Sequence, residues 1–242
     1  MKYLNWKIEK IDSNSPSKIE EMYSNGFVFT RIDKNIMHQT RSVRMKLADF
    51  DLSSENKRIL KKVENVEMKK VSLPLPLASE DNKNGYNWSI GKMAKDFYET
   101  KFGSGIMSAQ KIKEILTDGS KSNFNSLLTF DNVNDSSLNS VGYVICYENS
   151  KIMHYSYPFY DLKKIEDIEI PNNSLPKSIG LGMMTKAVLD AKNRGLEYVY
   201  LGSLQRPSDV YKLQFKGMEW FDGEKWETDL YKVKNILLDK TC

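Results

Sequence analysis

The segment from Lys177 to Lys216 constrains the fold more than any other part of this 242-residue chain. Gly180 and Gly182 stand where a helix would begin, and apolar residues then recur at spacings of three and four. Gly195 predicts the end of that helix, and the apolar run 197–201 that follows at once predicts a strand. This order is typical of a domain in which backbone N–H groups at a helix N-terminus approach an anionic ligand.

Composition and residue usage exclude several classes of protein. No apolar run approaches the roughly 20 residues needed to cross a bilayer, and the N-terminus lacks the continuous apolar segment that export requires. We therefore expect a cytoplasmic protein without a membrane partner. Cys146, Cys242 and the two histidines, His38 and His154, offer neither a disulfide framework nor metal-ligand spacing, so no metal is expected.

The pattern along the chain predicts an α+β fold, with one mostly antiparallel mixed sheet flanked by helices. Strands are predicted at 27–32, 42–47, 126–130, 141–147, 153–159 and 197–201. Helices are predicted at 17–23, 93–102, 108–116 and 209–216, besides the helix after Gly180 and one from Glu55. The proline- and asparagine-containing stretch 76–92 predicts a linker between a smaller N-terminal α/β lobe, 1–75, and a larger domain, 93–242.

The helix expected from Glu55 carries its charge on one face. Its apolar residues recur at helical spacing, and its basic residues are Lys57, Arg58, Lys61 and Lys62, with Lys69 and Lys70 shortly after. The net charge of the chain is only +4, and a basic helix face is more often merely solvated. The same face is also the minimum needed to hold an RNA phosphate backbone by point charges.

Lys177-x-x-Gly180-x-Gly182 resembles the pyrophosphate loop of the GCN5-related acetyltransferases. Several further segments, spread in order from about Tyr23 to Trp226, resemble the aminoacyl-tRNA–protein transferases, which are the arginyltransferases and their bacterial leucyl-transferring relatives. They are Arg41-Ser-Val-Arg44-Met-Lys-Leu47, Phe97-Tyr98-Glu-Thr-Lys101, Phe159-Tyr160-Asp161, Lys177-Ser178-Ile179-Gly180, Tyr198-Val-Tyr200-Leu201-Gly202 and Val210-Tyr211-Lys212.

This resemblance implies a fold like that of the GCN5-related acetyltransferases and a specific reaction. An amino acid, arginine or leucine, passes from its tRNA to the N-terminal amine of a protein that begins with an acidic residue, which marks that protein for degradation. Aminoacyl-tRNA is then a co-substrate and no cofactor is expected. No covalent intermediate is required, because the enzyme needs chiefly to align an amine with an ester carbonyl and to stabilise the oxyanion. The oligomeric state stays open.

The resemblance also implies site residues. Those implied in catalysis are Asp161, Tyr211 and Lys212. Those implied in substrate binding are Arg41, Arg44, Tyr160, Lys177, Ser178, Gly180, Tyr200 and Gly202. The two arginines would supply the cation that an acidic acceptor needs. Each assignment has a structural alternative: Asp161 as a cap for Lys163, and Tyr211 as a core residue.

Two departures from the family pattern leave alternatives open. The family commonly carries a cysteine cluster before the first arginine strand, whereas His38-Gln-Thr40 occupies that region here, so no metal or iron–sulfur cluster is carried over. Gly182 stands where these transferases often have a larger residue, which favours a coenzyme A loop and an N-acetyltransferase using acetyl-coenzyme A. A tRNA-binding protein without catalytic activity is a third hypothesis.

Overall fold

The structure is a computed structural model, and it describes residues 4–12, 15–79, 85–133, 140–166 and 178–238. Contacts group the chain into two compact units, each made of separate segments. Unit 1 comprises residues 1–53, 147–156 and 190–242, and unit 2 comprises 54–146 and 157–189. The chain is therefore grouped differently from the linear division expected at 76–92, a stretch that lies inside unit 2.

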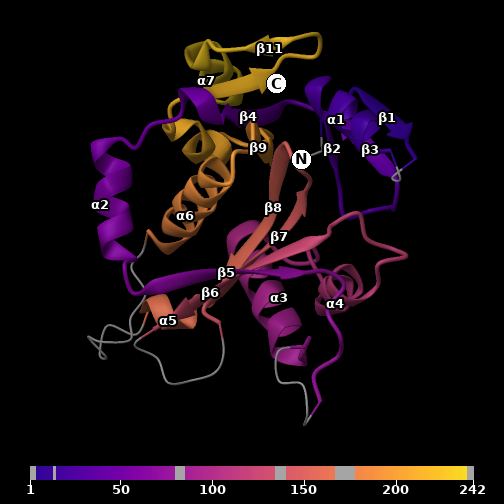
Figure 1. The fold of residues 1–242 in the computed structure, drawn as a ribbon, viewed down its shortest axis with the longest axis vertical. Helices are drawn as coiled ribbons and strands as arrows, with labels where there is room; N and C mark the ends of the chain where they lie inside the picture. The colour runs from indigo at the N-terminus through magenta and orange to yellow at the C-terminus, as the bar shows by residue number, and fades with distance from the viewer. Residues whose placement is uncertain (1–3, 13–14, 80–84, 134–139, 167–177, 239–242) are drawn as a thin grey trace. The chain divides into compact units, whose positions relative to one another are not determined.

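Unit 1 holds the N-terminal and C-terminal elements (Figure 1). They are β1 (Lys7–Lys10), α1 (Pro16–Ser24), β2 (Phe27–Phe29), β3 (Ile36–Gln39), β4 (Ser42–Lys46), the 3₁₀ helix η1 (Leu47–Asp49), β9 (Tyr198–Ser203), the 3₁₀ helix η2 (Pro207–Gln214), β10 (Met218–Phe221), β11 (Trp226–Glu227) and α7 (Leu230–Leu238). Strands β1, β3 and β2 form a small antiparallel sheet, in which β1 and β3 were not predicted.

Unit 2 holds the middle of the chain (Figure 1). Its elements are α2 (Ser54–Lys62), β5 (Val66–Ser72), α3 (Trp88–Phe102), α4 (Ala109–Thr117), β6 (Ser126–Asn132) and α5 (Lys163–Glu166). Strands β7 (Gly142–Glu148) and β8 (Ile152–Tyr160) and helix α6 (Ile179–Asn193) belong partly to each unit. Lys69 and Lys70, which the sequence grouped with the basic helix, lie on β5, an unexpected edge strand paired with β6.

Hydrogen-bonded strands follow the order β11-β10-β4-β9-β8 in unit 1 and β7-β6-β5 in unit 2. Strands β8 and β9 pair in parallel, whereas the pairs β11–β10, β10–β4, β4–β9, β7–β6 and β6–β5 are antiparallel. The α+β class and the mostly antiparallel mixed sheet flanked by helices are therefore confirmed. The predicted helix 209–216 is instead the 3₁₀ helix η2, which begins at Pro207 because that ring presets the backbone for a helical first turn.

Helix α6 follows the sequence prediction closely. Its apolar positions are buried, and Gly195 adopts a φ of 79°, which costs a glycine little. The N–H of Gly195 donates to the Lys192 carbonyl at 3.0 Å, and that of Leu196 donates to the Ala191 carbonyl at 3.1 Å. This pair of bonds satisfies the last carbonyls of the helix, so the predicted C-terminal stop is confirmed.

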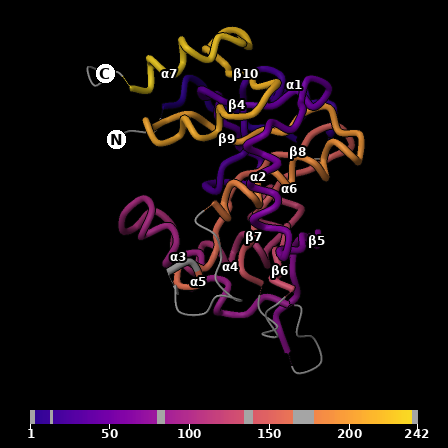
Figure 2. The backbone as a smooth tube through the Cα atoms, turned by 90° about the vertical axis from the view of Figure 1, so that its left-hand side faces the viewer, coloured from indigo at the N-terminus to yellow at the C-terminus, as the bar shows by residue number. Residues whose placement is uncertain are grey.

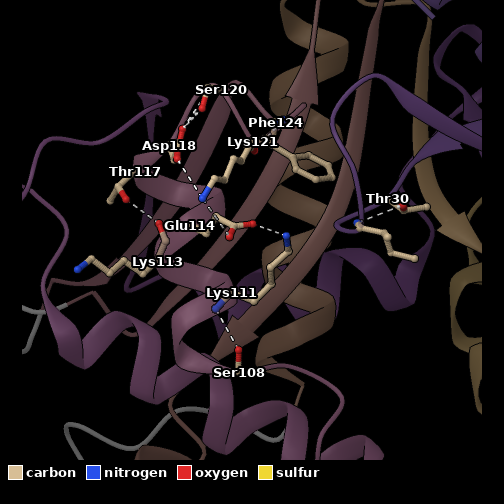
Figure 3. Close-up of polar contacts among 12 residues, drawn as sticks. Thr30, Ser108, Lys111, Lys113, Glu114, Thr117, Asp118, Ser120, Lys121 and Phe124 are labelled. Carbon is tan, nitrogen blue, oxygen red and sulfur yellow. Dashed lines mark hydrogen bonds and ion pairs between the residues drawn. The ribbon is translucent and has the colours of Figure 1, made fainter. Parts of the chain in front are cut away.

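Helices α3 and α4 lie side by side in unit 2 (Figures 1 and 2). Polar contacts fix both ends of α4, as Figure 3 shows: the Lys111 N–H donates to Ser108 Oγ at 3.0 Å, and Thr117 Oγ1 donates to the Lys113 carbonyl at 2.8 Å. The carboxylate of Glu114 accepts from Lys111 and pairs with Lys121. The Ser108 contact satisfies a backbone donor of the first turn of α4, which stabilises that end of the helix.

Candidate functional site

The site residues expected from the sequence fall into two groups, one in each unit. Unit 2 holds Tyr160, Asp161, Ser178, Gly180 and the basic face of α2, whereas Lys177 lies outside the described residues. Unit 1 holds Arg41, Arg44, Tyr200, Gly202, Tyr211 and Lys212.

In unit 2, the first turn of α6 packs against the end of β8. A Cβ placed on Gly180 would lie 3.0 Å from Cε1 of Tyr160 and 3.4 Å from its hydroxyl oxygen, so glycine leaves room for this ring. The Gly182 N–H already donates to the Ser178 carbonyl at 2.9 Å, which makes half-buried Ser178 the residue before the helix. The N–H groups of residues 179–181 are therefore the donors of this helix end that have no acceptor carbonyl within the helix.

Gly182 has a different reason to be glycine. A Cβ placed there would lie 2.7 Å from Val63 Cγ1 and 2.8 Å from its Cγ2, closer than real side chains approach. Val63 directly follows α2, which lies alongside α6 (Figure 2). Gly182 therefore lets the end of the basic helix pack on α6, and packing accounts for the residue that suggested a coenzyme A loop.

Replacing Gly182 with alanine is expected to lower the free energy of unfolding by about 1 to 2 kcal/mol, as overpacking does. An alanine in an unhindered helix interior would instead raise it by up to about 1 kcal/mol, so the sign of the change is decisive. Chemical denaturation of G182A measures the effect. In the V63A background, where the two methyl groups are gone, G182A should lower the free energy of unfolding much less than it does in the parent. An equal loss in both backgrounds would contradict this packing.

A cavity of about 590 Å³ lies between α3 and the segment that follows β8, entirely within unit 2. Its floor is apolar and aromatic: the rings of Phe97 and Tyr160 meet edge to face, with centroids 4.7 Å apart. Burial raises the pKa of Tyr160, so its hydroxyl stays protonated and able to donate. Tyr160 thus lines the cavity and also contacts Gly180, which joins two sequence motifs in one place.

Asp161 lines the same cavity, at the point where β8 ends. Its Oδ1 accepts the N–H of Lys163 at 3.0 Å, and its own N–H donates to the Val141 carbonyl at 2.9 Å. The capping role weighed for Asp161 is thus present in a residue that also lines the cavity. Both backbone contacts hold this side chain at the end of β8.

The basic face of α2 is open to solvent, since Lys57, Arg58, Lys61 and Lys62 are all exposed. Arg58 is held by Glu55 of the same helix, with Nε 2.7 Å from Oε2. Within the described part of the chain, the three lysines make no ion pair. Their ammonium groups are therefore available to an anionic partner.

Arg44 in unit 1 is largely buried, and its guanidinium group contacts a carboxylate, a hydroxyl and two aromatic rings. Its Nε lies 2.6 Å from Glu219 Oε2, and its Nη1 donates to the Tyr200 hydroxyl at 3.3 Å. The guanidinium carbon also lies 4.2 Å from the ring centroid of Tyr198 and 3.9 Å from that of Trp226. The strand register explains this, because Arg44 stands opposite Glu219 on β10 and opposite Tyr200 on β9.

Lys212 lies near the end of β9 in unit 1. Its Nζ donates to the Ser203 carbonyl at 2.8 Å and lies 3.6 Å from Asp209 Oδ1. Burial lowers the pKa of Lys212, and the Asp209 carboxylate partly offsets that effect. Gly202, on β9, adopts a φ of 77°. Tyr211, the residue before Lys212, is 45% exposed and is therefore not a core residue.

His154 is the buried titratable group that the sequence did not single out as functional. It lies on β8 and is 1% exposed, and Nδ1 shares a 2.9 Å hydrogen bond with the Tyr23 hydroxyl. Burial and the nearby Lys212 ammonium lower its pKa to about 3. The pairing of β8 with β9 ends at His154 and Tyr200, next to Gly202.

Two apolar residues of α3 that line the cavity, Met93 and Phe97, were also not predicted as site residues. Their spacing of four predicted only a helix face, because nothing local shows what that face would meet. Over the ranges that the structure covers, no cluster of histidine, cysteine or acidic side chains is arranged to hold a metal ion. No helix within those ranges is long and apolar enough to span a membrane.

The sequence matches no protein-family model and no curated protein. Among matching solved structures, L-PGS from Bacillus licheniformis is 10% identical with a TM-score of 0.44, over 92% of this chain and 61% of that one. FemX is 7% identical with a TM-score of 0.41, over 79% of this chain and 60% of that one. A GCN5-related glucosamine N-acetyltransferase region of a fungal multi-domain β-N-acetylglucosaminidase is 12% identical with a TM-score of 0.42. That match covers 85% of this chain and 22% of the other.

The chain thus spans about three fifths of the length of L-PGS, at 61%, and of FemX, at 60%. Because the TM-scores lie below 0.5 and the identities near a tenth, these likenesses carry no argument here. The function proposed next rests on this chain's own residues.

Proposed function

We propose that this chain is an acyltransferase that moves an amino acid from aminoacyl-tRNA to the N-terminal amine of proteins beginning with an acidic residue. The observation that supports it most is the meeting of Tyr160 with Gly180, beside Asp161 and a cavity of about 590 Å³. Two motifs that are separated in sequence therefore lie together in one candidate site: the end of the strand before Asp161 and the turn before α6. This site contains helix N–H donors, a protonated phenol and a carboxylate.

The reaction needs few groups. The acceptor amine attacks the ester carbonyl, so a C–N bond forms, the C–O bond to the terminal ribose breaks, and the ribose oxygen gains the proton that the amine loses. Asp161 is proposed to hold the α-ammonium group of the aminoacyl substrate. Tyr211 and Lys212 stay candidates for proton handling, although Lys212 is engaged by Ser203 and Asp209.

Recognition of an acidic acceptor is proposed for Arg44 on β4 and for Arg41 just before it. Arg44 is held by Glu219 at 2.6 Å, so an acceptor carboxylate would have to compete with that side chain. Arg41 is half-buried, one residue before the strand begins, and its carbonyl accepts from Leu204 N–H at 2.8 Å. Arg41 and Arg44 both stay candidates for this recognition.

The tRNA backbone is proposed to lie on the exposed lysines of α2. Changing Lys57, Lys61 and Lys62 together to glutamine should reduce the slope of log K against log salt by about 2 to 3 units, since each phosphate contact contributes roughly 0.7 to 0.9. Filter binding of tRNA at several salt concentrations measures the slope. A matched variant with Lys95, Lys113 and Lys121 changed to glutamine, which has the same net charge, should keep the parent slope; equal slopes in both variants would contradict this surface.

Labelled Arg-tRNA and Leu-tRNA, each supplied with peptides that begin with Asp, Glu or Ala, test the proposed function directly. Label should pass to the acidic peptides and not to the alanine peptide. If neither label reaches any peptide under conditions where a known transferase works, the proposal is wrong.

The acetyl-coenzyme A alternative keeps one observation in its favour, the spacing of Gly180 and Gly182. Val63 now gives Gly182 a packing role, which weakens the analogy with a coenzyme A loop. Saturable binding of acetyl-coenzyme A, followed by calorimetry, would restore that alternative.

A further inference from the structure

The floor of the unit 2 cavity is suited to an apolar group. Met93 and Phe97 lie one helical turn apart on α3, and Tyr160 and Leu162 face them from the end of β8 and the residues after it. Phe97 is 6% exposed, whereas Met93, Tyr160 and Leu162 are half-buried. A volume of about 590 Å³ exceeds that of one aliphatic side chain and is within the range of small-molecule sites.

Two of the three carboxylates around the cavity are already paired with lysines. Asp96 pairs with Lys92 of the same helix, and Glu99 lies 3.7 Å from Lys95. The third carboxylate, Asp161, uses one oxygen to accept a backbone N–H. A guanidinium entering this cavity would have to displace a lysine or leave part of its hydrogen-bonding capacity unused, and both cost free energy.

Further lysines line the same cavity. Lys163 and Lys164 follow Asp161 and begin α5, and with Lys92 they match the three carboxylates one for one. A cationic side chain would therefore meet as many ammonium groups as carboxylates. An uncharged apolar side chain needs only the floor, while its α-ammonium group needs one carboxylate.

We propose that this cavity binds the aminoacyl group and selects an uncharged, leucyl-type side chain over arginyl. This inference rests on the proposed function. The side chain packs on Met93, Phe97 and Leu162, and the α-ammonium group pairs with Asp161. Tyr160 then stands between this pocket and the first turn of α6, so the ester carbonyl lies on the helix side of the pocket.

Leucinamide and argininamide test the pocket without tRNA, because each carries the α-ammonium group and lacks a carboxylate. Calorimetry with the full chain should show saturable leucinamide binding, with argininamide at least 10-fold weaker. D161N should weaken leucinamide at least 10-fold. D118N is the matched control, because Asp118 also accepts a backbone N–H two residues on, from Ser120 at 2.9 Å, and lies outside the cavity. Equal or tighter binding of argininamide, or no binding of either amide, overturns the proposal.

A charge on the floor should reverse the preference. M93D is expected to bind argininamide more tightly than leucinamide, and L162D, on the other wall, should do the same if M93D fails to fold. Loss of leucinamide binding without any gain for argininamide in both folded variants overturns the assignment of this floor.

The transfer assay separates this inference from the function on which it rests. Transfer from Leu-tRNA at least 10-fold faster than from Arg-tRNA supports both. Preferential arginyl transfer overturns the pocket assignment and leaves the transferase, whereas no transfer, together with leucinamide binding at the pocket, overturns the transferase alone.

Discussion

Replacing Arg44 with methionine is expected to lower the free energy of unfolding by about 3 to 5 kcal/mol, which is the cost of leaving a buried ionic partner uncompensated. The carboxylate of Glu219 would lose the group 2.6 Å away that neutralises it, and its side chain is only 18% exposed. The rings of Tyr198 and Trp226 would also lose the cation between them. Urea unfolding of the full chain, followed by far-ultraviolet circular dichroism, measures the loss.

The double variant R44M/E219L is the control that separates charge from shape. With both charges gone, no desolvated carboxylate remains, so most of the lost stability should return. R44K keeps a cation but cannot stack its planar group between two rings, so it should lie between the parent and R44M. A double variant as unstable as R44M would mean that packing, rather than the ion pair, is what Arg44 supplies.

This arrangement also bears on the proposed acceptor site. A guanidinium that is paired with Glu219 and enclosed by two rings is preorganised and costly to move. Arg44 therefore acts first as a structural centre of the β4–β9–β10 layer. A lower affinity of R44M for acidic peptides is evidence that Arg44 recognises them only under conditions where the folded fraction of R44M equals that of the parent.

Local patterns in the sequence predicted the elements whose cause is local. The apolar spacing of α6 and the glycine at 195 specify a helix and its end without reference to the rest of the chain. Strand β5 was missed because Val66, Lys69 and Lys70 fit a continued basic helix, and only pairing with β6 makes them a strand. Helix η2 was predicted at 209–216 without its 3₁₀ character, because residue spacing alone does not distinguish the tighter turns of a 3₁₀ helix from those of an α-helix.

The candidate site divides in the same way. Motif order named Tyr160, Asp161 and Gly180, but the cavity that they share with α3 depends on contacts across 60 residues of chain, such as the Tyr98 hydroxyl with the Pro158 carbonyl. Gly182 shows the limit of motif reading, because a ligand loop and a helix packed on Val63 both require glycine. Only the neighbouring side chain distinguishes the two.

His154 makes the stability of unit 1 depend on pH. Its pKa is about 3 in the folded chain, lowered by burial and by Lys212, against an ordinary value of 6.5. The imidazole is therefore protonated near pH 6.5 in the unfolded chain but only near pH 3 in the folded chain. Because the unfolded state binds more protons between these values, acid favours unfolding. The stability due to the neutral imidazole is complete above pH 6.5 and is lost as the pH falls from there toward 3.

The expected loss is about 2 kcal/mol between pH 7 and pH 5, because the slope approaches roughly 1.4 kcal/mol per pH unit once the unfolded imidazole is protonated. Urea unfolding at half-unit steps from pH 7.5 to 4.5 measures it. H154Q keeps an acceptor near the Tyr23 hydroxyl but cannot titrate, so its stability should fall much less steeply. Burial also lowers the pKa of His38, which leaves a smaller residual slope in the same direction. A slope in H154Q equal to that of the parent would show that His154 is not the group that acid attacks.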